Sequence, residues 1–270
     1  MKHIEISNDY KVLTNSGSAG SQLKYHLDNI WYKVNCVGAE GKVEEIVSRL
    51  LECSNCEDFV YYSQCVINGR AGCMSENFLC EGESLITFER LYNMFTGKSL
   101  TEDVVRVRNI QDRYEFLCKS IFEITGVDIN PYLNNILCLD FITINPDRHF
   151  NNLALVTNGV NFRPAPIFDN GQGLGGNYNI TPPDLNVEEC CEALTANTIS
   201  GSFSSQIEVL TCRELQFNDE LLKAFMCSLP NSRFKSILKH RLELYLGKSI
   251  SEEDIINDNF LSGVNDISCI

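Results

Sequence analysis

The sequence predicts an α+β protein with two lobes, a β-rich N-lobe followed by a mostly helical C-lobe. In the first third, short runs of β-branched and aromatic residues at 11–13, 30–35 and 59–67 indicate strands. From Thr101 onward, apolar residues recur every three or four positions, as on one face of an amphipathic helix. A chain of 270 residues, 44% of them hydrophobic, is long enough to bury one core or two closely packed lobes.

The N-lobe is predicted to contain one helix among its strands. Residues 41–52 place their apolar side chains on one helical face, and residues 84–91 return to strand-like composition. Small and turn-forming residues over 14–21 predict a glycine-containing loop. The N-lobe is expected to cover residues 1–96.

The C-lobe is expected to cover residues 97–270. Its first helix begins near Thr101, and Gly126 ends it, because glycine readily adopts the left-handed conformation that terminates helices. Further helices are predicted over 131–142, 220–228 and 231–246.

The charge balance bears on the choice of partners. Asp and Glu number 36 against 22 Lys and Arg, which gives a net charge of -14. Such a chain repels a phosphate backbone and an anionic membrane surface, so neither nucleic acid nor a membrane is expected as a partner. The N-terminus lacks a basic region followed by an apolar stretch, and no run of about 18 apolar residues occurs. A cytoplasmic location is expected.

The 13 cysteines do not form the pattern of a disulfide-stapled domain, because their number is odd and their spacing irregular. A reducing compartment is therefore expected. Cys53 and Cys56 are one half of a zinc site if Cys65, Cys73 or Cys80 supplies the rest, although no second close pair follows. The other interpretation is that these thiols are small apolar residues.

The most informative stretch is residues 145–171, NPDRHFNNLALVTNGVNFRPAPIFDNG. Two short apolar runs, 153–156 and 165–168, flank Asn158 and Gly159 and predict a hairpin. Such a hairpin brings Asp169 beside Asn152. A carboxylate and an amide oxygen placed together can hold a magnesium ion that also binds nucleotide phosphates.

Asp147 lies a few residues upstream, where it can orient and deprotonate an attacking hydroxyl. The alternative is turn chemistry, because Asp, Asn and Gly are the commonest turn residues. His149 alone is as well explained by packing or hydrogen bonding.

The pattern D-R-H-x-x-N at 147–152, followed by I-F-D-N-G at 167–171, resembles the catalytic and metal-binding loops of HipA-like serine/threonine kinases. It resembles those of phosphoinositide-kinase-like enzymes more distantly. The resemblance implies a bilobal protein-kinase-like fold with an ATP cleft between the lobes. It implies that Asp147 is catalytic and that Asn152 and Asp169 bind magnesium. Arg148 and His149 are expected to support the loop.

The N-lobe resembles the same family at three further places. Residues 16–24, SGSAGSQLK, resemble the phosphate loop, which implies that the backbone of Gly17, Ser18, Ala19 and Gly20 contacts phosphates. Lys33 matches the strand lysine that reaches nucleotide phosphates. Glu44 matches the helix residue that pairs with this lysine, with Glu45 as the alternative.

Residues 85–92, LITFERLY, resemble the strand and linker between the lobes. By this match, the main chains of Glu89 and Leu91 contact adenine. Each N-lobe feature alone has a plainer interpretation: a hairpin loop, a solvated lysine or an apolar strand with a charged end. These features follow one another along the chain in the order that one kinase active site requires, and this order supports the resemblance.

The resemblance implies ATP and Mg²⁺ as cofactors and phosphoryl transfer to a protein serine or threonine. Autophosphorylation at Ser16, Ser18 or Ser21 is a subsidiary hypothesis, because charge added there opposes nucleotide phosphates. The alternatives are a kinase of small molecules or lipid head groups, and a nucleotide-binding pseudokinase or interaction module. An antitoxin-like partner follows from family analogy alone. Asn170 stands where many kinases have phenylalanine.

Overall fold

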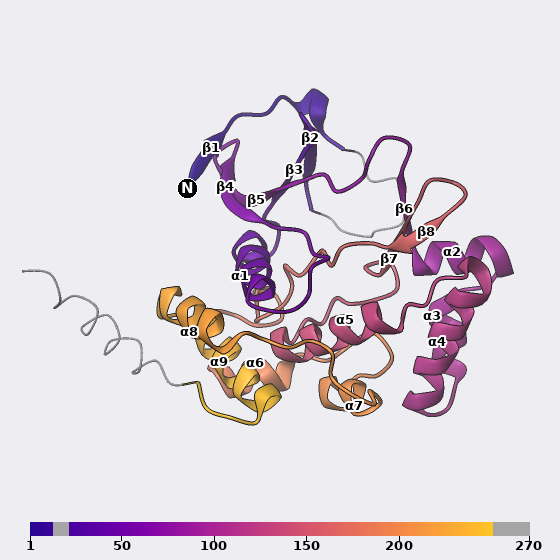
Figure 1. Ribbon diagram of the computed structural model, residues 1–270. Helices are drawn as coiled ribbons and strands as arrows, with labels where there is room; N and C mark the ends of the chain where they lie inside the picture. The colour runs from indigo at the N-terminus through magenta and orange to yellow at the C-terminus, as the bar shows by residue number, and fades with distance from the viewer. Residues whose placement is uncertain (13–21, 251–270) are drawn as a thin grey trace, which may run out of the picture.

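Two β-sheets organise residues 1–12 and 22–250, which are the parts of the chain that the computed structural model describes (Figure 1). The first sheet has five strands in the order β1-β4-β5-β3-β2. All neighbours are antiparallel except β1 and β4, which are parallel. Its strands are β1 (Lys2–Ile4), β2 (Lys24–Leu27), β3 (Ile30–Val34), β4 (Ser63–Ile67) and β5 (Arg70–Glu76).

Two tight hairpins set the register of this sheet. Asp28 and Asn29 connect β2 to β3 with φ of 51° and 62°, and Asn68 and Gly69 connect β4 to β5 with φ of 48° and 76°. Two-residue hairpins need left-handed backbone at both positions, which explains the choice of Asp, Asn and Gly. The register places Lys24 of β2 directly opposite Lys33 of β3.

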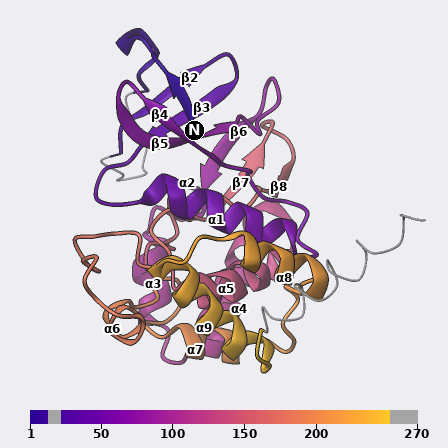
Figure 2. The ribbon, with the colours of Figure 1, turned by 90° about the vertical axis from the view of Figure 1, so that its left-hand side faces the viewer.

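Helix α1 (Glu40–Glu52) lies between this sheet and the helical part of the molecule (Figure 2). Its apolar face is fully buried, with Val43, Val47 and Leu50 at 0% exposure. The prediction of one helix over 41–52 is confirmed. Because α1 packs on β4 and β5 on one side and α8 on the other, it links the two halves of the structure.

The second sheet has the order β6-β7-β8 and is antiparallel. Its strands are β6 (Ser84–Thr87), β7 (Ala154–Thr157) and β8 (Phe162–Pro164). The predicted hairpin around Asn158 and Gly159 is confirmed, although its second strand begins and ends earlier than 165–168. Because β6 pairs with β7, this sheet joins residues on both sides of the expected boundary at 96, and that boundary stays a prediction.

Eight α-helices besides α1 occur in the described ranges, and they make up most of the second half (Figure 1). Helix α5 is central, because nearly all of its side chains are buried and it packs against α7 and α9. The eight α-helices are α2 (Phe88–Thr96), α3 (Leu100–Arg106), α4 (Ile110–Thr125), α5 (Asn130–Thr143), α6 (Val187–Ala193), α7 (Phe203–Glu208), α8 (Asp219–Ser228) and α9 (Arg233–Leu246). This architecture confirms the predicted α+β class, with a β-rich first part and a helical second part.

The predicted long helix from Thr101 to Gly126 is wrong in one respect, because the structure divides it into α3 and α4. Asn109 caps α4, its side chain accepting a hydrogen bond from Asp112 N at 2.7 Å. An asparagine cap of this kind begins a new helix although the apolar spacing continues across it. Gly126 ends α4 with a φ of 74°, as predicted.

The predicted strand over 59–67 is shorter than expected and begins at Ser63. Before Ser63 the backbone forms hydrogen bonds outside the sheet. Val60 N donates to Ile167 O at 2.9 Å, and Tyr62 N donates to Ser48 Oγ at 3.2 Å. This segment thereby brings Tyr62 beneath the first sheet, close to Lys33.

The structure gives no support to the zinc interpretation. Within the described ranges, no group of three or more His, Cys, Asp or Glu side chains is arranged to hold a metal ion. Cys53 and Cys56 are buried free thiols, and burial raises the pKa of each to about 11. No helix in these ranges is long and apolar enough to cross a membrane.

Candidate active site

The strand lysine lies at the centre of a buried polar cluster. Lys33 Nζ is 3.0 Å from Glu44 Oε1 and 2.9 Å from Asp169 Oδ1, and it donates a hydrogen bond to Tyr62 Oη at 3.1 Å. Burial alone would lower the pKa of Lys33, but the charges of Asp169 and Glu44 outweigh it and raise this pKa well above its ordinary value. Lys33 is therefore a fixed cation shared by two carboxylates.

Glu44 connects helix α1 to both the sheet and the loop that carries Asp169. One carboxylate oxygen pairs with Lys33, and the other accepts a hydrogen bond from Asn170 N at 2.8 Å. Glu45 instead accepts a hydrogen bond from Gln64 N at 3.3 Å. Of the two candidate glutamates, Glu44 is the one that the structure places beside the lysine.

The N-terminal end of α1 rests on the chain that follows Asp169. Ala39 N donates to Gly176 O at 3.0 Å, and Tyr178 N donates to Val37 O at 3.1 Å. A Cβ atom on Gly38 would lie 1.9 Å from the carbonyl oxygen of Gly176, so only glycine allows this approach. The contact holds α1, and with it Glu44, against the second half of the molecule.

The predicted catalytic loop lies between α5 and β7. Asn152 Nδ2 donates to the backbone oxygen of Asp147 at 2.7 Å and to its Oδ2 at 3.2 Å. The side chain of Asp147 is 47% exposed, whereas Asn152 is buried. Because its amide nitrogen is turned toward Asp147, the oxygen of Asn152 points away from that carboxylate.

Electrostatics raise the pKa of Asp147 above its ordinary value. Burial is the main cause, and the nearby charge of Asp169 acts in the same direction, while His149 opposes both. His149 Nε2 lies 3.5 Å from Asp147 Oδ1. A carboxylate with a raised pKa and an exposed edge is suited to accepting a proton.

Arg148 joins the catalytic loop to the segment that carries Asp169. Its guanidinium is buried, pairs with Asp140 of α5 at 3.1 Å and donates to Phe168 O at 2.8 Å. It also donates to Asn170 Oδ1. One side chain therefore fixes the loop of Asp147 relative to that of Asp169, which agrees with the supporting role predicted for Arg148.

Asn170 replaces the phenylalanine of many kinases and is 1% exposed. Its side chain accepts from Arg148, and its N–H donates to Glu44. The residue before it, Asp169, has a φ of 60° in the left-handed region. These polar contacts, rather than an apolar side chain, hold the loop in place.

Lys24 belongs to the same cluster, although sequence reasoning assigned it no role. It lies opposite Lys33 across the β2–β3 pair, and burial lowers its pKa, while the charge of Asp169 opposes that effect. Burial would raise the pKa of Asp169, but Lys33 and Lys24 together hold it well below its ordinary value. The sequence signal that could have placed Lys24 beside Lys33 is the Asp28-Asn29 turn, which sets the pairing register of β2 and β3.

The predicted adenine contacts are not supported. The extended linker expected over 85–92 ends at Thr87, whose side chain caps α2 by accepting from Arg90 N at 3.2 Å. Glu89 N donates to Phe150 O, and Leu91 is fully buried inside α2. The main-chain nitrogen of Glu89 is therefore used within the fold, and adenine binding by Glu89 and Leu91 stays a prediction that these contacts do not support.

The carboxylate of Glu89 has a structural role instead. It accepts hydrogen bonds from Leu100 N at 3.1 Å and Thr101 N at 2.9 Å at the start of α3. The four predicted phosphate-loop residues, Gly17, Ser18, Ala19 and Gly20, lie outside the described residues. Their role stays a prediction.

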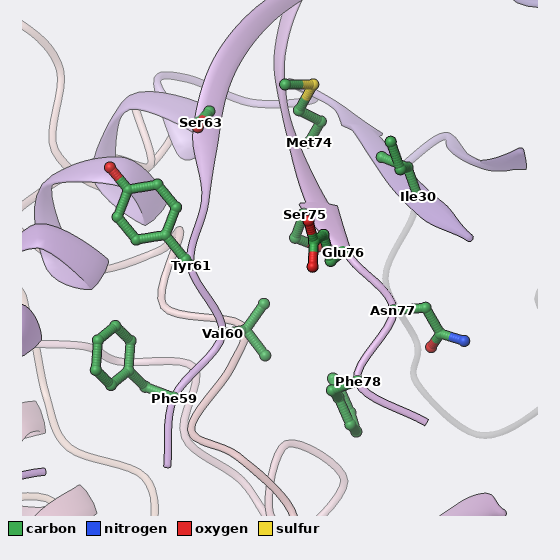
Figure 3. Close-up of a pocket in the computed structure, with 10 residues that line it drawn as sticks. All are labelled: Ile30, Phe59, Val60, Tyr61, Ser63, Met74, Ser75, Glu76, Asn77 and Phe78. Carbon is green, nitrogen blue, oxygen red and sulfur yellow. The ribbon is translucent and has the colours of Figure 1, made fainter. Parts of the chain in front are cut away.

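A cavity of about 510 Å³ lies at one end of strands β4 and β5 of the first sheet, between 59–63 and 74–78 (Figure 3). Ile30 and Met74 line it and belong to the face of the sheet opposite Lys33, because side chains alternate along a strand. In Figure 3, the side chains of Val60 and Phe78 point from these two segments into the space between them. Ser75 also lines it and lies on the face that carries Lys33, so the cavity extends to both faces of the sheet and borders the cluster around Lys33.

Comparisons with known proteins identify the fold. No family model matches the chain, and no curated protein matches it. The solved structure of the proinflammatory kinase CtkA from Helicobacter pylori covers 92% of this chain and 94% of its own, with a TM-score of 0.55 and 14% sequence identity. The HipA–HipB–operator DNA complex from Shewanella oneidensis MR-1 covers 92% of this chain and 68% of its own, with a TM-score of 0.49 and 14% identity.

The match to CtkA extends over nearly the full length of both chains. It confirms the protein-kinase-like fold expected from the motifs, with the N-terminal sheet and α1 above a helical part. At 14% identity the likeness concerns the fold, and the side chains determine the chemistry.

Proposed function

We propose that this chain is an ATP- and Mg²⁺-dependent phosphotransferase, a HipA-like kinase that acts on a protein serine or threonine. The observation that carries the proposal is the continuous network from Lys33 through Glu44 and Asn170 to Arg148. This network joins a phosphate-binding cation, a carboxylate suited to magnesium and a candidate base in one site.

Nucleotide phosphates would bind at Lys33 and Lys24, the two lysines that face Asp169. The donors fit a magnesium ion, because Asp169 offers a carboxylate and Asn152 an amide oxygen turned away from Asp147. Magnesium bound there would neutralise charge on the phosphates. With magnesium bound, Asp169 would give up its pairing with Lys33, and the phosphates would take its place beside the lysine.

Asp147 would position the acceptor hydroxyl and take up its proton as the oxygen attacks the γ-phosphorus. Its raised pKa suits that role, and its contact with Asn152 directs the carboxylate. Arg148 would not touch the nucleotide, because its guanidinium is engaged with Asp140, Phe168 O and Asn170. It would keep the base and the metal ligand at a fixed separation.

The test is transfer of label from γ-labelled ATP to the protein itself or to a generic Ser/Thr substrate such as myelin basic protein. Asp147→Asn should slow transfer by roughly 10²- to 10⁴-fold, the usual contribution of a general base. Asp128→Asn is the matched control, because Asp128 is exposed and asparagine can still accept from Asn130 N. Full activity in Asp147→Asn would refute this residue assignment.

A further inference from the structure

The segment before β4 carries a buried tyrosine into the cluster around Lys33. Tyr62 is 2% exposed, and its hydroxyl oxygen accepts a hydrogen bond from Lys33 Nζ at 3.1 Å. The same ammonium lies 4.8 Å from the centre of the Tyr62 ring, within the range of a cation–π contact. Glu44 and Asp169 hold Lys33 by charge, whereas Tyr62 holds it with a neutral oxygen and an aromatic ring.

The position of Tyr62 is fixed by the helix and by the loop that complete the cluster. Tyr62 N donates to Ser48 Oγ of α1 at 3.2 Å. Backbone hydrogen bonds of 2.9 and 2.8 Å join residues 58–60 to Ile167. Ile167 lies two residues before Asp169, so the chain that carries Tyr62 is attached to the segment that carries the predicted metal ligand.

Apolar side chains surround the rest of the tyrosine ring. The residues packed with it are Val60, Cys73, Phe78 and Phe168. Burial is the main cause that raises the pKa of the Tyr62 hydroxyl well above its ordinary value, so this group stays protonated at the pH of the reaction. A neutral oxygen orients the ammonium without compensating its charge, whereas a third carboxylate would compete with the phosphates for it.

The proposed reaction removes one of the partners of Lys33. Three described side chains accept hydrogen bonds from its ammonium, and Asp169 is the one that would turn to magnesium. Among the described residues, Glu44 and Tyr62 would then remain to hold it. Because lysine has a flexible stem, two partners from different elements define its direction better than one.

We infer that Tyr62 is a positioning residue for the proposed phosphoryl transfer, because its hydroxyl keeps the ammonium of Lys33 directed at the nucleotide phosphates while Asp169 binds magnesium. The inference rests on the proposed function and assigns a further role at the same site. Tyr62 acts through Lys33, so loss of its hydroxyl should weaken the binding of phosphates whether or not a nucleoside is attached to them.

The experiment compares two ligands by calorimetry, magnesium ATP and magnesium tripolyphosphate, which has the phosphates but no nucleoside. Tyr62→Phe removes a single oxygen atom and keeps the ring. The hydrogen bond to Lys33 exists before and after the ligand binds, so only its gain in strength counts. We therefore expect the affinity for both ligands to fall by the same factor, roughly 3- to 10-fold.

Tyr245→Phe is the matched control. Tyr245 of α9 is also a buried tyrosine, and its hydroxyl donates to Leu215 O at 2.7 Å in the helical part of the molecule. This variant should lower the free energy of unfolding and leave the affinity for both ligands unchanged. If Tyr245→Phe weakened tripolyphosphate binding as much as Tyr62→Phe, the effect would reflect a general loss of stability and would overturn the inference.

The kinetics of phosphoryl transfer give a second readout. Tyr62→Phe should raise KM for ATP and change kcat by no more than about threefold, because an interaction made in both the ground state and the transition state alters KM alone. A purely structural role would instead reduce the folded fraction, which lowers the apparent kcat at unchanged KM. That result would overturn the inference, and so would a loss of affinity for ATP without a loss for tripolyphosphate.

The role of Tyr62 and the proposed activity can fail independently. Wild-type protein that transfers phosphate, together with a folded Tyr62→Phe variant that binds both ligands normally, contradicts the role of Tyr62 alone. Tyr62-dependent binding of both ligands without any phosphoryl transfer contradicts the proposed activity alone. Absence of binding of either ligand to the wild-type protein contradicts both.

Discussion

The ammonium of Lys33 lies 2.9 Å from the carboxylate of Asp169, although 136 positions separate the two residues in the sequence. The pair joins the first sheet to the loop after β8, and Glu44 completes it from α1. Nucleotide and metal binding would have to rearrange this pair. It therefore contributes to the stability of the fold and is also part of the proposed chemistry.

Replacing Lys33 by methionine should destabilise the protein. The variant leaves the buried Glu44 and the partly buried Asp169 without their nearest cation, and loss of one member of a buried pair costs about 3–5 kcal/mol. Urea unfolding should show this loss, with exposed Lys98→Met as the control. Adding Asp169→Asn to Lys33→Met should cost less than the two single losses combined, because the unpaired charge is removed. Fully additive losses would contradict the pairing.

The adjacent glutamates of α1 offer a matched pair of variants. Glu44→Gln should lower phosphoryl transfer by roughly 10- to 100-fold, because hydrogen bonds to charged groups contribute about 1.5–3 kcal/mol each. Glu45→Gln should change it by no more than about twofold, since Glu45 contacts Gln64 away from the site. Initial rates with γ-labelled ATP make the comparison. A larger effect at Glu45 would mean that the helix is rotated in the active state.

Arg148 should be intolerant of replacement. Arg148→Met leaves the buried Asp140 carboxylate unpaired, and the free energy of unfolding should fall by about 3–5 kcal/mol. Arg148→Lys should recover little, because one ammonium cannot reproduce the several directed bonds of a guanidinium. Urea unfolding measures both, with the exposed Arg106→Met expected to cost less than about 1 kcal/mol. If Arg148→Met left the free energy of unfolding unchanged, this result would contradict the role of Arg148 in joining the two loops.

The pH dependence of the reaction should report Asp147. A base must be deprotonated to act, and burial raises the pKa of Asp147, so kcat/KM should fall on the acid side at a pH above the ordinary aspartate value of about 3.9. His149→Gln removes a neighbour that lowers this pKa, which should move the acid limb to higher pH. The pH profiles of the two proteins test this. An acid limb that moves to lower pH in His149→Gln would contradict the assignment of this limb to Asp147.

The sequence predicted the local elements of the site better than its long-range pairing. Helix α1, the hairpin after the catalytic loop and the glycine that ends α4 all follow from local propensity and turn chemistry, and all three are confirmed. The choice between Glu44 and Glu45 could not be made from the sequence, because neighbouring helix residues differ only in rotation about the axis.

Tertiary contacts account for the rest. Tyr62 reaches Lys33 only because the segment before β4 leaves the sheet to bond with Ile167. The linker prediction was wrong because 85–92 reads as one apolar strand, whereas Thr87 caps a helix. Pairing of Arg148 with Asp140 is likewise a tertiary contact that no local motif indicates.

The most direct test of the central claim is the initial rate of γ-phosphoryl transfer as a function of magnesium concentration, for the wild-type protein and Asp169→Asn. The account predicts transfer by the wild-type protein that requires magnesium, and little or no transfer by Asp169→Asn at any magnesium concentration. Transfer that proceeds without magnesium, or that survives in Asp169→Asn at the wild-type rate, would contradict it.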